Sequence, residues 1–132
     1  MNKLLGCYRV VYNQCLLRKK KSYEESKTTE NLSSLSKFFH HELLKDDNFV
    51  FLREHNTKVL KQSIRDMLSA YDNFFKLHRG YPKFKSKNDK TQSCRFELAT
   101  ISKRNDYTTY HISLANIKNI KFRCSEKYAN YL

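Results

Sequence analysis

Glycine is scarce in this sequence, which has two glycines, one proline and no tryptophan among 132 residues. Gly6 and Gly80 lie far apart, whereas P-loops and dinucleotide-binding loops need clustered glycines, so nucleotide-binding enzymes of those types are excluded. Long hydrophobic runs are also missing, because no apolar stretch approaches the roughly 18 residues of a membrane span. Lys3, Arg9 and Asn13 interrupt the N-terminal residues, so we expect no signal peptide, no membrane partner and a cytoplasmic location.

The four cysteines, Cys7, Cys15, Cys94 and Cys124, are widely spaced and include no C-x-x-C pair. A structural zinc site needs closely spaced ligand pairs, so we expect four reduced thiols and neither a metal nor another cofactor. The five histidines have no carboxylate or nucleophile at a diagnostic spacing, and the aspartates show no pattern that would converge on Mg²⁺. We therefore expect no catalytic residue in this chain.

Positive charge dominates, because 26 Lys and Arg against 13 Asp and Glu give a net charge of +13. Residues 1–21 contain six bases and no acid, residues 22–54 contain four bases and seven acids, and residues 76–95 contain seven bases and one acid. Two basic blocks around an acidic stretch suit the binding of a polyanion, so nucleic acid is the expected partner. The alternative is a solvated basic surface.

Apolar residues at three- and four-residue spacing predict three helices. The first is expected over residues 3–21, where the bases Arg18, Lys19 and Lys20 suit the dipole of a last turn and are candidate nucleic-acid contacts. The second is expected from about residue 29 to residue 45. The third begins after a cap at Asn56 or Thr57 and runs to about residue 78. Gly80 is the expected left-handed residue behind it, and Pro82 prevents its continuation.

Beyond residue 90 the apolar period changes to two, which is typical of strands. We expect three antiparallel strands, over residues 94–101, 107–114 and 117–123, with a turn over residues 102–106. In the last strand Ile120 and Phe122 alternate with basic residues. The predicted fold class is α+β, with a three-helix N-terminal lobe followed by a small, incompletely closed antiparallel sheet or barrel.

The most distinctive segment, residues 74–87, reads FFKLHRGYPKFKSK. It predicts an aromatic helix end, a tight turn and an extended run in which Tyr81 and Phe84 alternate with lysines. Aromatic rings stack on bases and lysines neutralise phosphates, although Tyr81 and Phe84 could instead anchor the turn to the third helix. The expected phosphate contacts are Arg79, Lys83, Lys85 and Lys87.

Three motifs in order resemble the N-terminal part of the TnpB family of insertion-sequence transposase proteins, a region described as a helix-turn-helix domain. They are GCYRVVYN at residues 6–13, AYDNFF at residues 70–75 and GYPKFKSK at residues 80–87. SCRF at residues 93–96 and the strand-like residues 112–123 follow in the family's order. The resemblance covers residues 6–123.

The resemblance implies part of an RNA-guided DNA nuclease, in which a helical recognition lobe and a wedge barrel hold the guide RNA and read a short motif beside the DNA target. It assigns residues 1–78 to the recognition lobe, residues 79–91 to a basic linker and residues 92–132 to wedge-type strands. It also implies that the chain ends before the Mg-dependent RuvC-like nuclease domain. We therefore expect DNA and structured guide RNA as partners, no cleavage by this chain, and a separately encoded nuclease portion as a possible further partner.

The resemblance also implies which side chains face backbone phosphates or the lobe interface, namely Arg9, Asn13, Lys83, Lys85, Lys87 and Arg95. Thr57 and Lys61 would lie near the DNA duplex as base readers. Two alternatives remain open. A stand-alone helix-turn-helix DNA-binding regulator would give a palindromic footprint, and a degenerate transposase remnant would have no independent activity.

Overall fold

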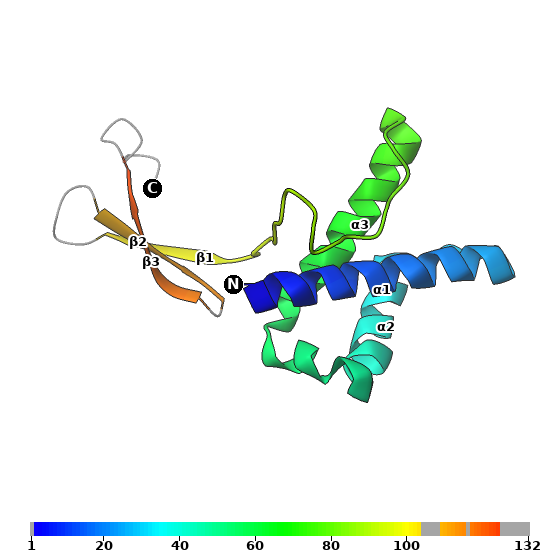
Figure 1. Ribbon diagram of the computed structural model, residues 1–132, viewed down its shortest axis with the longest axis horizontal. Coiled ribbons are helices and arrows are strands. Elements are labelled where there is room, and N and C mark those ends of the chain that lie inside the picture. Colours follow the sequence, from blue (N-terminus) through cyan, green and yellow to red (C-terminus); the bar gives the residue numbers. More distant parts are fainter. Residues whose placement is uncertain (1, 104–108, 116, 125–132) are drawn as a thin grey trace. The chain divides into compact units, whose positions relative to one another are not determined.

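The computed structural model describes residues 2–103, 109–115 and 117–124, which form two compact units, Met1–Arg95 and Phe96–Leu132 (Figure 1). The first unit contains the helices and the second contains the sheet. The α+β fold class is confirmed. The segment predicted as a basic linker, residues 79–91, lies within the first unit. In the described residues, no helix is both long and apolar enough to span a bilayer.

Helix α1 (Asn2–Ser26) buries one stripe of side chains at helical spacing, which includes Tyr8, Tyr12 and Leu16. The predicted end at residue 21 is wrong, because the helix continues for five more residues and has no base in its last turn. The run Arg18–Lys21 therefore lies inside the helix rather than in its last turn.

Helix α2 (Leu32–Phe38) begins at a capping box, in which the Asn31 side chain accepts from the backbone N–H of Ser34 and the Ser34 hydroxyl accepts from the backbone N–H of Asn31. Such a box satisfies two backbone donors that a helix start leaves unpaired. The chain continues as the π-helical turn η1 (Phe39–Leu43) and the 3₁₀ segment η2 (Asp47–Glu54). The predicted second helix is therefore split into an α part and a π part.

Helix α3 (Thr57–Leu77) begins after Asn56, whose side chain accepts from the backbone N–H of Lys58, so the predicted cap is confirmed. Its end differs from the prediction. His78 takes the left-handed conformation, with φ 50° and ψ 34°, while Gly80 has no positive φ. The left-handed turn therefore comes two residues earlier than the glycine suggested, and it is a non-glycine residue that adopts it.

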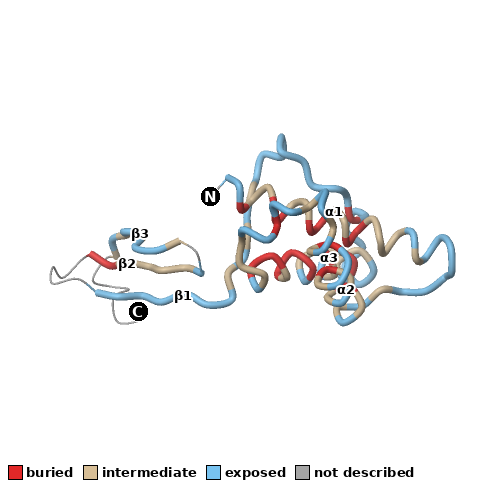
Figure 2. Tube along the Cα trace, turned by 90° about the horizontal axis from the view of Figure 1, so that it is seen from below, coloured by how far each residue is buried: buried red, intermediate tan, exposed pale blue. Residues whose placement is uncertain are grey.

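The core of the first unit lies between α1, the α2–η1 segment and α3 (Figure 2). Its fully buried side chains include Leu16, Leu35, Phe39, Leu60 and Ile64. These residues come from all three helical segments, so burial of their apolar faces holds the segments together. By contrast, the chain after α3 is mostly exposed, with Pro82 buried.

The second unit is an open antiparallel sheet of strand order β1-β2-β3 in its described part: β1 (Ala99–Lys103), β2 (Thr109–Leu114) and β3 (Ile117–Arg123). β3 has its predicted bounds, and the Tyr110 and Phe122 rings stack as a cross-strand pair, 5.6 Å between centroids. The first strand begins at Ala99 rather than at residue 94, because the chain up to Arg95 packs with the first unit. Most of the predicted turn over residues 102–106 lies outside the described residues.

Candidate nucleic-acid interface

The side chain of Asn13 on α1 holds the extended segment after α3 at Lys85. Its Nδ2 donates to the Lys85 carbonyl oxygen at 2.9 Å, and its Oδ1 accepts from the Lys85 backbone N–H at 2.7 Å. The Asn13 side chain thus bonds both the N–H and the carbonyl oxygen of one residue, as a neighbouring strand would in a sheet. The Lys85 Nζ also lies 5.1 Å from the centroid of the Tyr12 ring, a cation–π distance. The two basic blocks of the sequence are therefore joined at this point.

Arg9, one turn before Asn13, holds the end of the same segment. Its Nη1 donates to Oε1 of Gln92 at 2.6 Å. The Gln92 amide donates in turn to three carbonyl oxygens of the turn before it, those of Ser86, Lys87 and Asp89. Arg9 and Gln92 thus fix the path of residues 86–92. Gln92 was not among the predicted contacts, because a lone glutamine in a polar segment forms no recognisable pattern.

A groove of about 530 Å³ lies along this part of α1. Its lining includes the predicted residues Arg9, Asn13 and Lys85, and Lys3 adds a base that was not among the predicted contacts. Glu54 is the acidic residue in the lining. Three bases around one groove provide a positive surface on which a phosphate backbone can lie.

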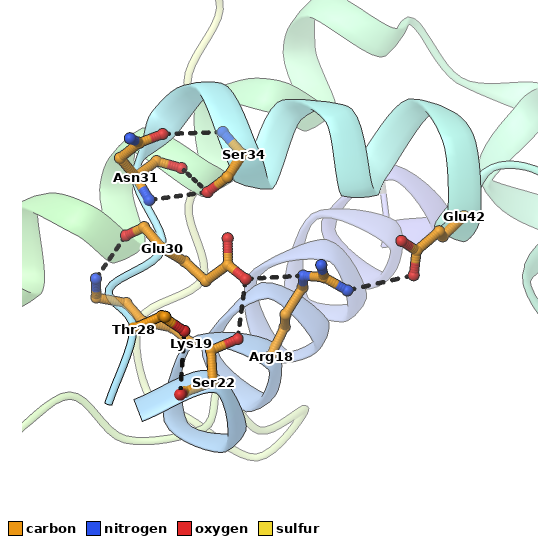
Figure 3. Close-up of polar contacts among 8 residues, drawn as sticks. All are labelled: Arg18, Lys19, Ser22, Thr28, Glu30, Asn31, Ser34 and Glu42. Carbon is orange, nitrogen blue, oxygen red and sulfur yellow. Dashed lines mark hydrogen bonds and ion pairs between the residues drawn. The ribbon is translucent and has the colours of Figure 1, made fainter. Parts of the chain in front are cut away.

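Arg18 and Lys19 contact other parts of the protein (Figure 3). The Arg18 Nε lies 3.2 Å from Oε1 of Glu30 and its Nη1 lies 3.3 Å from Oε2 of Glu42, while its guanidinium lies over the Phe38 ring at 4.7 Å. The Lys19 Nζ donates to the backbone carbonyl of Glu30 at 2.7 Å. Both predicted nucleic-acid contacts therefore tie α1 to the chain around α2.

The carboxylate of Glu30 is the centre of this network. Burial alone would raise its pKa, but hydrogen bonds from Ser34 and Ser22 and the Arg18 guanidinium outweigh burial and hold the pKa below 4.5, its ordinary value. The ionised carboxylate is therefore favoured in the folded state, and its contribution to stability is present at pH values above 4.5.

Replacing Glu30 with glutamine should lower the free energy of unfolding by about 1 kcal/mol at pH 7, because a charge-assisted interaction becomes a neutral one. The difference between wild type and E30Q should shrink as the pH falls through the lowered pKa of Glu30, where its carboxylate becomes neutral as well. Urea denaturation of both proteins at pH 7, 5 and 3, followed by circular dichroism, measures this difference. A constant gap over that range would contradict the assignment.

Aromatic rings gather where α3 ends, and Lys20 lies beside them. Tyr81 packs edge-on against Tyr71 and Phe74, and its hydroxyl lies 3.1 Å from that of Tyr71. The Lys20 Nζ lies 5.2 Å from the centroid of the Tyr81 ring and 4.8 Å from that of Phe84. Tyr81 therefore anchors the chain after α3, which agrees with the predicted alternative that it holds the turn against the third helix. About half of its surface remains exposed.

The other predicted side chains differ in solvent exposure and in whether they contact other residues. Lys83 and Lys87 are exposed, and their side chains have no hydrogen bond or ion pair in the described part of the chain; the same is true of Arg79. Thr57 and Lys61 are half-buried in the first turns of α3. The pKa of His40 is lowered mainly by burial, and the positive charge of Lys61 lowers it further.

Arg95, the last predicted residue, forms an ion pair inside the first unit. Its Nη2 lies 2.9 Å from Oδ1 of Asp66 on α3. The other oxygen of Asp66 accepts a hydrogen bond of 2.5 Å from the hydroxyl of Tyr8 on α1. Asp66 thus joins two helices to the end of the first unit.

Within residues 2–103, 109–115 and 117–124, no group of three or more His, Cys, Asp or Glu side chains is placed to hold a metal ion. Burial raises the pKa of Cys7 and Cys94, and it raises the pKa of Cys15 to about 12. These three thiols therefore stay protonated near neutral pH and are poor nucleophiles.

Comparison with known proteins gives two similarities. A model of the helix-turn-helix domain of OrfB proteins of the IS605 group matches residues 1–28. A protein of Streptomyces pristinaespiralis, named "Putative RNA-guided DNA endonuclease", is 27% identical over 110 residues, which are 83% of this chain and 27% of that protein. The predicted likeness to the N-terminal part of TnpB-family proteins is thereby confirmed. The chain spans about a quarter of the length of this relative.

The TnpB-like motifs meet in the structure. Within the stretch that matches the helix-turn-helix domain, residues 2–28 consist of the single helix α1 and the two residues after it. Arg9 and Asn13 belong to the first TnpB-like motif and Lys85 belongs to the third, and the Asn13–Lys85 hydrogen bonds connect the two. The second motif, residues 70–75, supplies Tyr71, Phe74 and Phe75 to the aromatic cluster.

Proposed function

We propose that this chain binds DNA and structured RNA through the basic surface of its first unit, as the N-terminal part of a TnpB-like, RNA-guided endonuclease. The joining of the two basic blocks by Asn13 and Lys85 carries the proposal. That junction puts the groove beside α1 next to the segment that carries Lys83 and Lys87. Phosphate contacts of this kind give affinity without sequence preference.

The free and the engaged bases have different roles in the proposal. Arg18 and Arg95 form ion pairs, and Lys19 donates to the backbone carbonyl of Glu30. These contacts hold the helices and the end of the first unit together, and they leave the three bases less able to neutralise a phosphate. Lys83 and Lys87 extend into solvent from a segment whose path is fixed at both ends. We therefore assign the phosphate contacts chiefly to these lysines, to Arg79 and to the groove.

In this proposal residues 1–78 act as a recognition lobe, residues 79–91 as its basic edge and residues 92–132 as wedge-type strands. Thr57 and Lys61 would approach the DNA duplex from the start of α3, and the structured RNA is the guide. Strand cleavage is assigned to the part of the relative that this chain does not span.

The double substitution K83A/K87A should weaken binding to an RNA hairpin and to duplex DNA roughly tenfold at 50 mM salt, because two phosphate contacts are lost. For duplex DNA the slope of log K against log salt should become shallower by roughly 1.8, or about 0.9 for each contact. Fluorescence anisotropy over a salt series measures both quantities.

The matched control is K37A/K45A, which removes the same charge from exposed positions within the acidic stretch. It should leave affinity and slope nearly unchanged, because Lys37 and Lys45 belong neither to the groove lining nor to the segment of residues 83–87. An equal loss for both double variants would mean that net charge alone drives binding, and the proposed surface would then be wrong. A palindromic DNase footprint would favour the stand-alone regulator instead.

A further inference from the structure

An aromatic pocket of about 510 Å³ lies between the last turns of α1 and α3 in the first unit. Tyr71, Phe74, Phe75 and Tyr81 form one wall, and Lys19, Lys20 and Tyr23 come from α1. Its volume falls within the roughly 300–1,000 Å³ of pockets that hold small organic ligands. The pocket is therefore large enough for one nucleobase with its ribose.

Two rings of this pocket remain open to solvent. Phe75 is 67% exposed and Tyr23 is 58% exposed, although both are large apolar side chains next to a packed core. Phe75 stacks on Tyr71 with an angle of 19° between the ring planes and continues the aromatic wall outward. Exposed aromatic rings arranged in this way form a platform on which an unpaired base can stack.

The charge around the pocket indicates what would fill it. The Lys20 ammonium lies over the Tyr81 ring, and the free lysines begin two residues after Tyr81, at Lys83. A positive rim of this kind suits a phosphate-linked ligand better than an apolar peptide. A strand that entered the pocket with one base could continue along the segment of residues 83–87.

The remaining wall favours ribose over deoxyribose. It contains the carboxylate of Glu24 and the hydroxyls of Thr28 and Thr29. The Thr28 hydroxyl donates to the backbone carbonyl of Ser22 at 3.3 Å, which leaves its oxygen free to accept a hydrogen bond. A ribose 2′-hydroxyl can donate to such oxygens, and this group is the one that distinguishes RNA from DNA.

We propose that this aromatic pocket holds one unpaired nucleotide of a single-stranded RNA segment, with its base stacked on Phe75 and Tyr23 and its ribose against Glu24 and the two threonines. This inference rests on the proposed function, because it assigns one contact within a larger nucleic-acid surface. It adds a stacking contact that is independent of phosphate neutralisation and hence nearly independent of salt.

The test uses an unstructured ten-nucleotide RNA that carries 2-aminopurine at one position, with the DNA of the same sequence beside it. Wild type should bind the RNA and quench the 2-aminopurine fluorescence through stacking. Y23A/F75A should bind the RNA roughly tenfold or more weakly and lose the quenching, while its salt slope stays the same. F75W should retain both affinity and quenching.

The control variant is L77A, which removes an exposed apolar side chain from the same end of α3 but outside the pocket lining, and it should behave as wild type. Unchanged RNA binding and quenching by Y23A/F75A would overturn the pocket and leave the proposed function standing. An equal loss with the DNA strand would overturn the assignment to RNA. Conversion of a wild-type dimer into a monomer by Y23A/F75A, with RNA binding intact, would identify a second copy as the occupant. Failure of wild type to bind any nucleic acid would overturn the proposed function and this inference together.

Discussion

Replacing Phe39 with alanine should lower the free energy of unfolding of the first unit by about 3–5 kcal/mol. Phe39 is 0% exposed and is among the largest of the fully buried side chains. It begins the π-helical turn η1, where α2 changes its winding. Truncation would remove a whole ring from water-free packing and leave a cavity, because a core held by three helical segments can collapse only in part.

Guanidinium denaturation followed at 222 nm measures this loss, since the described helices all belong to the first unit. The neighbouring Phe38 provides a matched control. It is half-buried, its ring lies under the Arg18 guanidinium at 4.7 Å, and F38A should cost about 1 kcal/mol. If F39A and F38A shift the midpoint equally, the core does not depend on Phe39 as the structure indicates.

The parts of the fold that could be predicted from the sequence are those determined by nearby residues, through apolar spacing, helix caps and alternation. The amphipathic stripe and the Asn56 cap located α3, and strict alternation located β3. The end of α1 could not be predicted in this way, because a run of bases is a local stop signal that distant acids override. Glu30 and Glu42 hold Arg18 from 12 and 24 residues away, and the helix continues beyond it.

In the candidate interface, too, some features follow from local sequence and others depend on contacts between distant residues. The TnpB-like motifs marked Arg9, Asn13 and Lys85 as candidate contacts, and the structure brings these three residues together around one groove. The motifs did not indicate which of the bases remain free. That depends on contacts between residues 72 and 83 positions apart, Asn13 with Lys85 and Arg9 with Gln92. Charge counting treats every lysine alike. Only the fold separates Lys83 and Lys87 from bases such as Arg18, which already have acidic partners.

Replacing Asp66 with alanine should lower the free energy of unfolding by about 2–3 kcal/mol, chiefly because the buried hydroxyl of Tyr8 would lose its acceptor. Burial and the hydrogen bond to Asp66 both raise the pKa of Tyr8, so this hydroxyl stays protonated and needs an acceptor throughout the neutral range. The ion pair with Arg95 adds less, because the Arg95 side chain is 68% exposed.

D66N and Y8F separate the two contributions. The amide oxygen of D66N still accepts from Tyr8, so this variant should lose only about 1 kcal/mol, mainly the charge on the Arg95 side. In Y8F no hydroxyl is left unpaired, so D66A in that background should cost less than D66A alone. Equal losses for D66A and D66N would show that charge, rather than the unpaired hydroxyl, sets the stability. RNA affinity at a temperature where D66A is folded should not fall, because the substitution releases the Arg95 guanidinium and removes a negative charge from the basic surface.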